Sequence, residues 1–109
     1  MAELDLSKVG NGTPSIVQVH DPSCQLCARL QKETRDALAG FDKSKLNYLV
    51  ANITTEDGAG FAAAYSVPHV TLVLFDGDGK VLEVLNGVRQ AEELEATFLS
   101  HFRRSRLRS

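Results

Sequence analysis

The sequence of 109 residues has little of what several protein classes require: it contains two cysteines, three prolines, one methionine and no tryptophan. Two cysteines are too few for a scaffold held together by disulfides. No apolar run approaches the roughly 18 residues that a membrane-spanning helix needs. The chain is not of the disordered class, because 43% of its residues are hydrophobic and its net charge is only −2. We therefore expect one globular domain over residues 1–109, without a membrane span.

Charge is distributed unevenly along the chain. All 14 acidic residues precede residue 103, whereas four of the 12 basic residues are arginines in the last seven positions. A basic end can hold phosphate or anionic lipid, but the body that carries it is acidic, which argues against a nucleic-acid partner. We expect residues 103–109 to be a solvated basic tail, in which arginine also complements the dipole of the preceding helix. Its arginines are Arg103, Arg104, Arg106 and Arg108.

The first residues carry no secretory signal. Residues 1–12 read MAELDLSKVGNG, which includes acidic residues and lacks the apolar stretch of such a signal. By default the expected location is the cytoplasm; it lies outside the cytoplasm if an export signal or anchor has been trimmed from the chain. Residues 1–14 are interpreted as an N-terminal extension of the domain.

Apolar periodicity predicts alternating strands and helices. The continuous apolar run 70–75 is typical of a central strand buried on both faces, and the loop 76–79 leads into an antiparallel partner. Gly58 and Gly60 indicate a loose helix start. The order β-α-β-α-β-β-α predicts an α/β fold with a parallel βαβ unit and a mixed sheet of about four strands. Strands are expected at 15–20, 46–53, 70–75 and 81–85, and helices at about 24–39, 55–65 and 90–102.

The two cysteines form the motif Cys24-Gln25-Leu26-Cys27. A structural disulfide here would close a loop of a few residues, and the stabilisation by a crosslink grows with the loop it closes. Two thiols three positions apart at a helix start can instead pair and separate with little backbone motion. The first thiol also lies at the positive end of the helix, which favours its thiolate. A C-x-x-C that follows a strand and opens a helix therefore indicates a redox dithiol.

The chain resembles the thioredoxin family over roughly residues 15–102. The strand 16–20 followed by Cys24 and Cys27 is similar to the strand and redox helix of the family. Tyr65-Ser66-Val67-Pro68 followed by Leu72-Val73-Leu74-Phe75-Asp76-Gly77 is similar to its proline loop, apolar strand and hairpin, and Gly87 matches the glycine that ends its last strand. The resemblance implies the thioredoxin fold, a three-layer α/β/α sandwich, with a cis-proline loop facing the two cysteines.

The resemblance also implies a protein-disulfide oxidoreductase that needs no bound cofactor. Cys24 is the expected nucleophile because it lies at the helix start, and Cys27 is expected to resolve the mixed disulfide. The expected partners are a protein substrate bearing a disulfide or dithiol and a reductase or oxidase that resets the pair. We expect a monomer. Reductants and oxidants share this motif and differ in redox potential, so both directions of electron flow are open.

Departures from the family pattern indicate a specialised relative. Ser23 replaces the tryptophan that often precedes the first cysteine. Gln18 occupies the strand position where thioredoxins proper carry a buried acid that assists proton transfer. The dipeptide between the cysteines, Gln-Leu, matches none of the well-known subgroups. These departures argue against a general-purpose thioredoxin.

The position of the proline loop also departs from the family. Pro68 lies two residues further from the hairpin than the cis-proline of the family, and counting back from Phe75 reaches Val70 instead. A cis bond before a residue other than proline costs about 3–4 kcal/mol. We therefore predict that Pro68 is the cis residue, that it binds substrate together with Val67, and that a bulge or longer strand absorbs the surplus.

Three histidines have different expected roles. His20, four residues before Cys24, can favour the thiolate or shuttle a proton; the alternative is a hydrogen-bonded residue at the end of a strand. His69 is expected near the cysteines if the thioredoxin layout holds, and it is otherwise a loop residue. His101 is interpreted as a structural residue of the last helix.

The same residues suggest a second function class, a thioredoxin-fold binding module with little turnover that holds a metal ion or a protein partner. Cys24, Cys27, His20 and His69 are together enough for tetrahedral zinc or copper(I). Structural zinc sites usually draw on two close-spaced ligand pairs, whereas these histidines are far apart in the sequence. The dithiol interpretation is therefore preferred, with no metal assigned.

Overall fold

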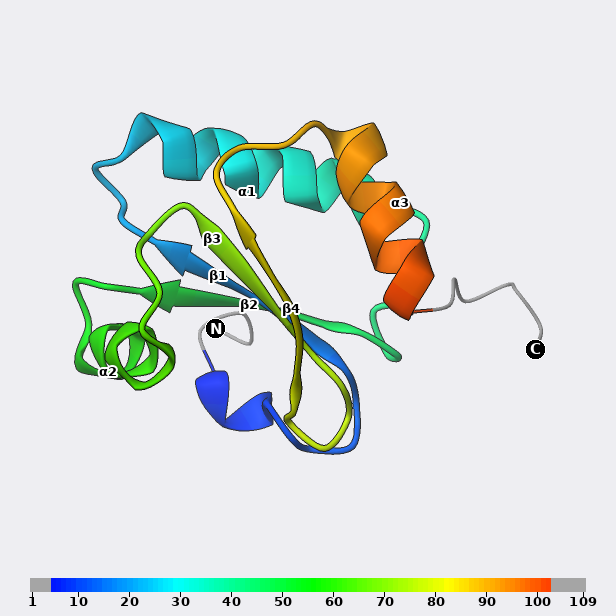
Figure 1. Ribbon diagram of the computed structural model, residues 1–109, viewed down its shortest axis with the longest axis horizontal. Coiled ribbons are helices and arrows are strands. Elements are labelled where there is room, and N and C mark those ends of the chain that lie inside the picture. Colours follow the sequence, from blue (N-terminus) through cyan, green and yellow to red (C-terminus); the bar gives the residue numbers. More distant parts are fainter. Residues whose placement is uncertain (1–4, 103–109) are drawn as a thin grey trace.

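The structure is a computed structural model that describes residues 5–102; the basic tail from Arg103 onward lies outside the described residues. The described part contains four strands and three α-helices, preceded by one 3-10 turn (Figure 1). No helix in this part is long and apolar enough to cross a membrane. The elements are η2 (Leu6–Lys8), β1 (Ser15–His20), α1 (Gln25–Ala37), β2 (Asn47–Asn52), α2 (Glu56–Tyr65), β3 (Thr71–Phe75), β4 (Val81–Asn86) and α3 (Ala91–His101).

The four strands form one mixed sheet in the order β2-β1-β3-β4. Strand β1 pairs with β2 in parallel and with β3 in antiparallel orientation, and β4 is the antiparallel partner of β3. The predicted βαβ unit, closing hairpin and element order are therefore confirmed. Every residue of β3 is buried, as the continuous apolar run 70–75 indicated, because strands in the middle of a covered sheet have no solvent-facing side.

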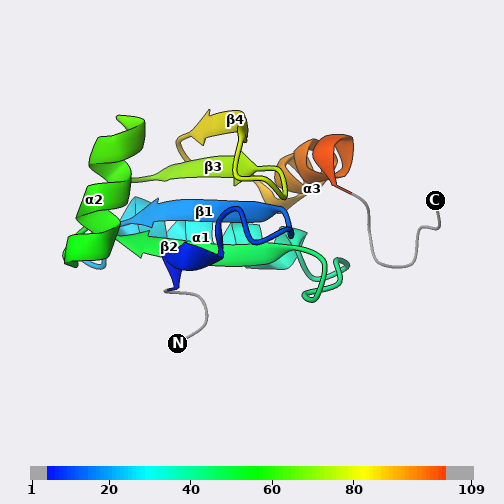
Figure 2. The ribbon, with the colours of Figure 1, turned by 90° about the horizontal axis from the view of Figure 1, so that it is seen from below.

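Helices cover both faces of the sheet and complete three layers. Helices α1 and α3 lie side by side on one face, and α2 and η2 lie on the other (Figures 1 and 2). Alternate residues of the central strands therefore enter two separate cores. The core under α1 and α3 includes Ile16, Leu30, Leu72, Leu74, Leu94 and Phe98. The core under α2 and η2 includes Val17, Leu49, Ala51, Val73 and Phe75, with Leu6, Val9, Phe61 and Val67 packed against it.

Helix α3 is capped by a side chain from another helix. Its own N-cap residue, Gln90, makes no side-chain cap hydrogen bond. The backbone N–H of Ala91 instead donates to Glu33 Oε1 of α1 at 2.8 Å. A carboxylate is well suited to this place because the N-terminal end of a helix carries a partial positive charge. The bond attaches the start of α3 to the helix that begins at the cysteines.

Replacing Leu72 by alanine is expected to lower the free energy of unfolding by about 3 kcal/mol, because a large buried side chain leaves a cavity when it is truncated. Leu72 is fully buried in β3, opposite Gln18 of β1 and Leu85 of β4. Urea unfolding followed by circular dichroism measures the change. Leu82→Ala on β4, where the side chain is 39% exposed, is the matched control with a smaller expected loss. A loss below about half a kcal/mol at Leu72 would contradict a central β3.

Candidate active site

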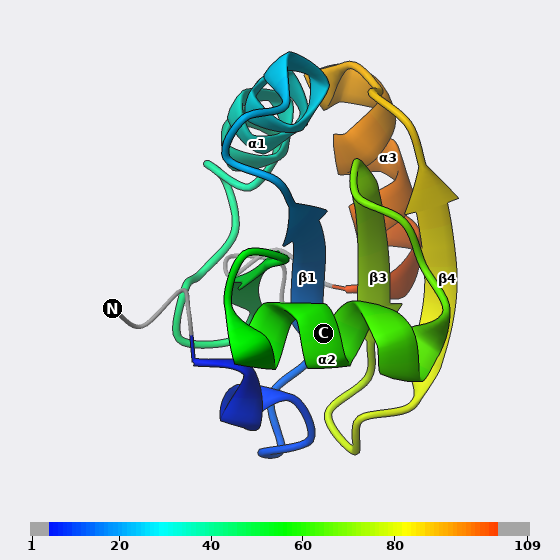
Figure 3. The same ribbon diagram turned by 90° about the vertical axis from the view of Figure 1, so that its left-hand side faces the viewer.

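The cysteine pair lies where β1 ends and α1 begins, at the edge of the sheet that faces the viewer in Figure 3. The chain turns sharply here because Asp21 accepts hydrogen bonds from the residues that follow it. Its carboxylate accepts hydrogen bonds from the backbone N–H and the hydroxyl of Ser23 at 3.0 and 2.9 Å. Its carbonyl accepts the N–H of Cys24 at 3.0 Å. This Asx-type turn directs the chain into α1.

Cys24 is the N-cap residue of α1. Its backbone is extended, and its Sγ accepts the N–H of Cys27 at 3.3 Å. This is the place where serine, threonine or aspartate normally satisfies a free helix N–H. A sulfur there lies next to an N–H donor and the positive end of the helix dipole, and both favour negative charge on it. The side chain is partly exposed, so a partner can reach it.

Cys27 lies one turn further along α1 and is fully buried. Burial raises the pKa of the Cys27 thiol, and this outweighs the backbone amides of Asp21 and Val70, which lower it. The neighbouring Cys24 sulfur raises the pKa further. Both cysteines are free thiols in this structure. The pair therefore combines one accessible sulfur at a helix end with one buried sulfur that keeps its proton at neutral pH.

A buried glutamine connects the cysteine helix to the sheet. Gln18 of β1 is fully buried, and its Nε2 donates to the carbonyl of Cys27 at 2.9 Å. Its Oε1 accepts the hydroxyl of Tyr48 of β2 at 2.7 Å, and Nε2 also lies 3.3 Å from His20 Nδ1. A buried amide is stable only when its polar atoms have partners. In the sequence, Gln18 was notable only because it replaces the buried acid of thioredoxins. In the structure, it is a neutral side chain whose hydrogen bonds join β1 to α1 and to β2.

The three histidines are placed differently. Because the Gln18 amide donates to Nδ1 of His20, the imidazole carries its proton on Nε2. Burial lowers the pKa of His20 and nearby Arg35 adds to this, while Asp21 opposes it, so the ring is neutral at neutral pH. His69 is exposed.

Hydrogen bonds from Ser23 lower the pKa of the Asp21 carboxyl, and the neighbouring His69 and His20 contribute to the same shift. His69 therefore lies at the cysteine end of the molecule, within electrostatic range of Asp21. His101 is hydrogen-bonded to Glu83 of β4 at 2.7 Å, which agrees with the structural interpretation of this residue.

The prediction of a cis-proline at position 68 is wrong, because none of the peptide bonds within residues 5–102 is cis. Pro68 is exposed, and Val67 packs against the core under α2. The backbone of Val70 lies beside the Cys27 thiol instead, and its N–H donates to the carbonyl of Val19 at 3.0 Å.

The loop between α2 and β3 contains two left-handed residues, and the pairing of β3 with β4 has a register shift between Leu74 and Phe75. Ser66 and Val70 both have left-handed backbone angles, with φ of 55° and 59°. Ser66 ends α2 in this conformation, and Val70 turns the chain back into β3. A valine in the left-handed region is uncommon because its β-branched side chain crowds the backbone.

Among residues 5–102, no group of three or more histidine, cysteine or acidic side chains is arranged to hold a metal ion. The four residues considered for zinc or copper(I), Cys24, Cys27, His20 and His69, are therefore not assembled as a ligand set in the described structure. The metal-binding interpretation receives no support from the geometry.

Replacing Gln18 by leucine is expected to lower the free energy of unfolding by about 2 kcal/mol, although leucine has a similar volume. The change leaves the carbonyl of Cys27 and the hydroxyl of Tyr48 without their Gln18 partner in a buried setting. Chemical denaturation measures the loss. Gln18→Glu keeps an acceptor oxygen for the Tyr48 hydroxyl but replaces the amide donor with a second oxygen, so it tests whether the donor to Cys27 is the essential part. Equal stability of wild type and Gln18→Leu would show that the network contributes nothing.

The three-dimensional structure is similar to solved structures of thioredoxins and thioredoxin-like proteins. An uncharacterised thioredoxin-like protein from Clostridium perfringens superposes with a TM-score of 0.76 at 19% identity, over 97% of this chain and 85% of that one. Thioredoxin-2 of the malaria parasite gives 0.70 at 18% identity, over 82% and 84%. Fasciola hepatica thioredoxin gives 0.69 at 19% identity, over 85% of both chains.

The chain has a thioredoxin fold. No protein-family model matches the sequence, and no curated protein matches it significantly. At these low identities the similarity establishes the fold alone. Within this thioredoxin fold, the free thiols of Cys24 and Cys27 have C-x-x-C spacing and lie at the start of α1. The resemblance noted in the sequence is therefore confirmed for the fold.

Proposed function

We propose that this protein is a thiol–disulfide oxidoreductase that exchanges electrons with a disulfide- or dithiol-bearing partner through Cys24 and Cys27. The observation that supports this most directly is the asymmetry of the pair. Cys24 is partly exposed and its sulfur accepts a helix N–H, whereas Cys27 is buried and burial raises its pKa. Exchange by a dithiol needs this division into an attacking thiolate and a second, resolving thiol.

The proposed reaction has two steps. The thiolate of Cys24 attacks one sulfur of the partner disulfide, so an S–S bond forms to Cys24 while the partner S–S bond breaks and one partner sulfur leaves as a thiolate. Cys27 then loses its proton to that thiolate or to water, and its sulfur attacks the Cys24 sulfur. The mixed disulfide between Cys24 and the partner breaks, and the second partner sulfur leaves as a thiolate that takes up a proton from solvent. The products are a Cys24–Cys27 disulfide and a reduced partner, so two electrons have passed to the partner. The reverse sequence oxidises a dithiol.

The surroundings of the pair affect the second step. Gln18 stands where an acid would accept the proton of Cys27, and an amide cannot do so at any pH. His20 is neutral at neutral pH, but its Nδ1 is occupied by the Gln18 amide. We therefore assign Gln18 the role of positioning the first turn of α1, and His20 the role of holding Gln18 in place. Resolution by Cys27 is then expected to depend on solvent or the departing thiolate.

The proposal is tested by measuring whether the reduced protein, with dithiothreitol as the electron source, accelerates reduction of the insulin disulfides. The Cys24→Ser, Cys27→Ser double variant is the control for non-specific effects. Equilibration with glutathione buffers of known ratio gives the reduction potential, which decides between reductant and oxidant. Oxidoreductase function predicts one two-electron couple and turnover above the double variant. A wild-type rate equal to that of the double variant in both reduction and dithiol oxidation would refute it.

A further inference from the structure

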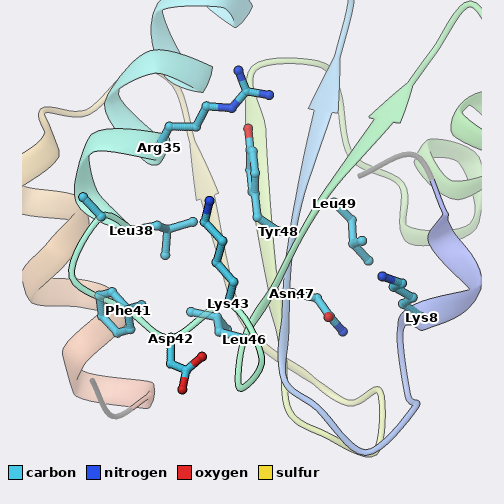
Figure 4. A pocket seen from close by; sticks show the side chains of 11 residues that line it. Lys8, Arg35, Leu38, Phe41, Asp42, Lys43, Leu46, Asn47, Tyr48 and Leu49 are labelled. Carbon is cyan, nitrogen blue, oxygen red and sulfur yellow. The ribbon is translucent and has the colours of Figure 1, made fainter. Parts of the chain in front are cut away.

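We propose that the cleft between the C-terminal half of α1 and strand β2 binds an amphipathic anion, a small molecule with an apolar body and a carboxylate or comparable head group. The cleft has a volume of about 550 Å³, within the range of roughly 300–1,000 Å³ that is typical of small-molecule sites. It is lined by the end of α1, the 38–46 loop, the first half of β2 and Lys8 of η2 (Figure 4). It includes neither cysteine, so this function is separate from disulfide exchange.

The apolar part of the cleft is built from the core itself. Phe41 and Leu46 are almost fully buried and belong to the core under α1 and α3, with Leu38 and Tyr48 packed against them. Phe41 also contacts Phe98 of α3 edge-on, with ring centroids 6.4 Å apart. Side chains held in this way cannot collapse into the cleft without loss of core packing. The apolar surface is therefore preformed, which lowers the entropic cost of binding an apolar body.

The charged part of the cleft is positive although the chain as a whole is acidic. Lys8, Arg35 and Lys43 come from three separate segments and line the same cleft. The one acid among the lining residues is Asp42, whose carboxylate accepts the N–H and hydroxyl of Ser44 at 2.9 and 2.7 Å. These two hydrogen bonds account for most of the lowered pKa of Asp42.

The two lysines are not held in close ion pairs within the described residues, and Asp5 is within electrostatic range of Lys8. Neither Lys8 nor Lys43 forms an ion pair with a carboxylate among residues 5–102. Arg35 lies over the Tyr48 ring, with Cζ 5.9 Å from the ring centroid, and in Figure 4 its guanidinium lies at the hydroxyl end of that ring. Charge complementarity therefore selects an anion, and the apolar floor selects one with an apolar body.

Decanoate is a suitable probe, used below its micelle concentration and followed by ¹H–¹⁵N NMR on the whole chain. Saturable shifts are expected in residues 35–49 and around Lys8. Acetate, which has the head group alone, and decyltrimethylammonium, which has the same chain with the opposite charge, are expected to cause much smaller shifts. Absent shifts, shifts spread over other faces, or an equal response to the cationic analogue would overturn the proposal.

Variants assign the binding to the cleft. Lys43→Gln is expected to weaken decanoate binding about threefold to fivefold, as the loss of one exposed ion pair would, and Lys8→Gln combined with Lys43→Gln about tenfold. Lys45→Gln is the matched control, because Lys45 lies in the same loop but does not line the cleft. If Lys45→Gln weakened decanoate binding as much as Lys43→Gln does, the effect would be one of net charge alone, and the assigned site would be refuted. Insulin reduction by Lys43→Gln is expected to be unchanged, so failure of this proposal is distinguishable from failure of the redox proposal.

A lipid bilayer presents the same chemistry as a free amphipathic anion, and vesicles separate the two sources. We expect no co-sedimentation of the protein with phosphatidylglycerol vesicles, because a cleft with a preformed apolar floor accommodates one molecule and not a flat surface. Co-sedimentation that disappears in Lys43→Gln would assign the cleft to a membrane headgroup and overturn the proposal of a free small molecule.

Discussion

Cys24→Ser is expected to abolish disulfide exchange, whereas Cys27→Ser is expected to retain the attack and to accumulate a mixed disulfide with its partner. The Cys24 sulfur is accessible and accepts the N–H of Cys27 at the positive end of α1, so it is the sulfur on which negative charge is favoured. Without Cys27, no second thiol of the pair attacks the mixed disulfide, so the partner stays bonded to Cys24. Non-reducing gels and mass spectrometry of each variant incubated with a disulfide substrate measure the two outcomes.

Alkylation tests the same assignment without mutation. Because burial raises the pKa of Cys27, the thiolate fraction of Cys27 stays small at neutral pH and grows only as the pH rises well above the ordinary range of thiols. A limiting amount of iodoacetamide at about pH 6.5 should therefore label Cys24 first, and labelling of Cys27 should rise steeply in alkaline buffer. Peptide mapping locates the label. Labelling of Cys27 first, or trapping of partners by Cys24→Ser, would reverse the assignment.

Gly58→Ala is expected to destabilise the protein by about 3 kcal/mol or more, at the upper end of overpacking effects, even though alanine favours helices. A Cβ on Gly58 of α2 would lie 1.9 Å from the carbonyl oxygen of Asn52 and 2.4 and 2.6 Å from its carbonyl carbon and nitrogen. These are backbone atoms of the last residue of β2 and cannot rotate away. The same oxygen accepts the N–H and hydroxyl of Thr55 at 3.0 and 2.7 Å, so relief requires α2 to move off the sheet.

Gly60→Ala is the matched control for this prediction. Gly60 is two residues further along α2, and a Cβ there meets nothing within 4 Å. The substitution is expected to raise the free energy of unfolding by up to about 1 kcal/mol, because alanine loses less backbone entropy in a helix than glycine. Urea denaturation of the two variants side by side gives the comparison. Similar effects of both substitutions would show that α2 does not pack closely on Asn52.

Local patterns were sufficient to predict the elements and their order. The apolar run 70–75 indicated a strand buried on both faces, and β3 is buried throughout. The segment from His20 to Cys24 indicated a strand that ends and a helix that begins, because Asp21 and Ser23 form turns through contacts two residues apart. The C-x-x-C spacing placed both sulfurs at the start of α1. Contacts of this kind join residues a few positions apart, so the local sequence is enough to predict them.

Long-range approach of backbones was not predictable in this way. Gly58 and Gly60 look alike in the sequence as signs of a loose helix start, but only Gly58 packs closely on the end of β2. Pro68 was the natural choice for a cis residue from its type alone. The register of β3 against β1 instead brings the backbone of Val70 to Cys27, and the loop before β3 contains two left-handed residues.

The sequence by itself determined the strand and helix pattern, the α/β class and the pair of thiols at a helix start, because these follow from periodicity and from contacts a few residues apart. Only the tertiary structure decided what surrounds the pair. It buries Cys27 and leaves Cys24 partly exposed, and it brings Gln18 into hydrogen bonds with Tyr48 and with the carbonyl of Cys27. It also decided the cleft that combines Lys8 with the end of α1. The physical reason is that each of these arrangements depends on distances between segments that are far apart in the chain, and those distances are set by packing.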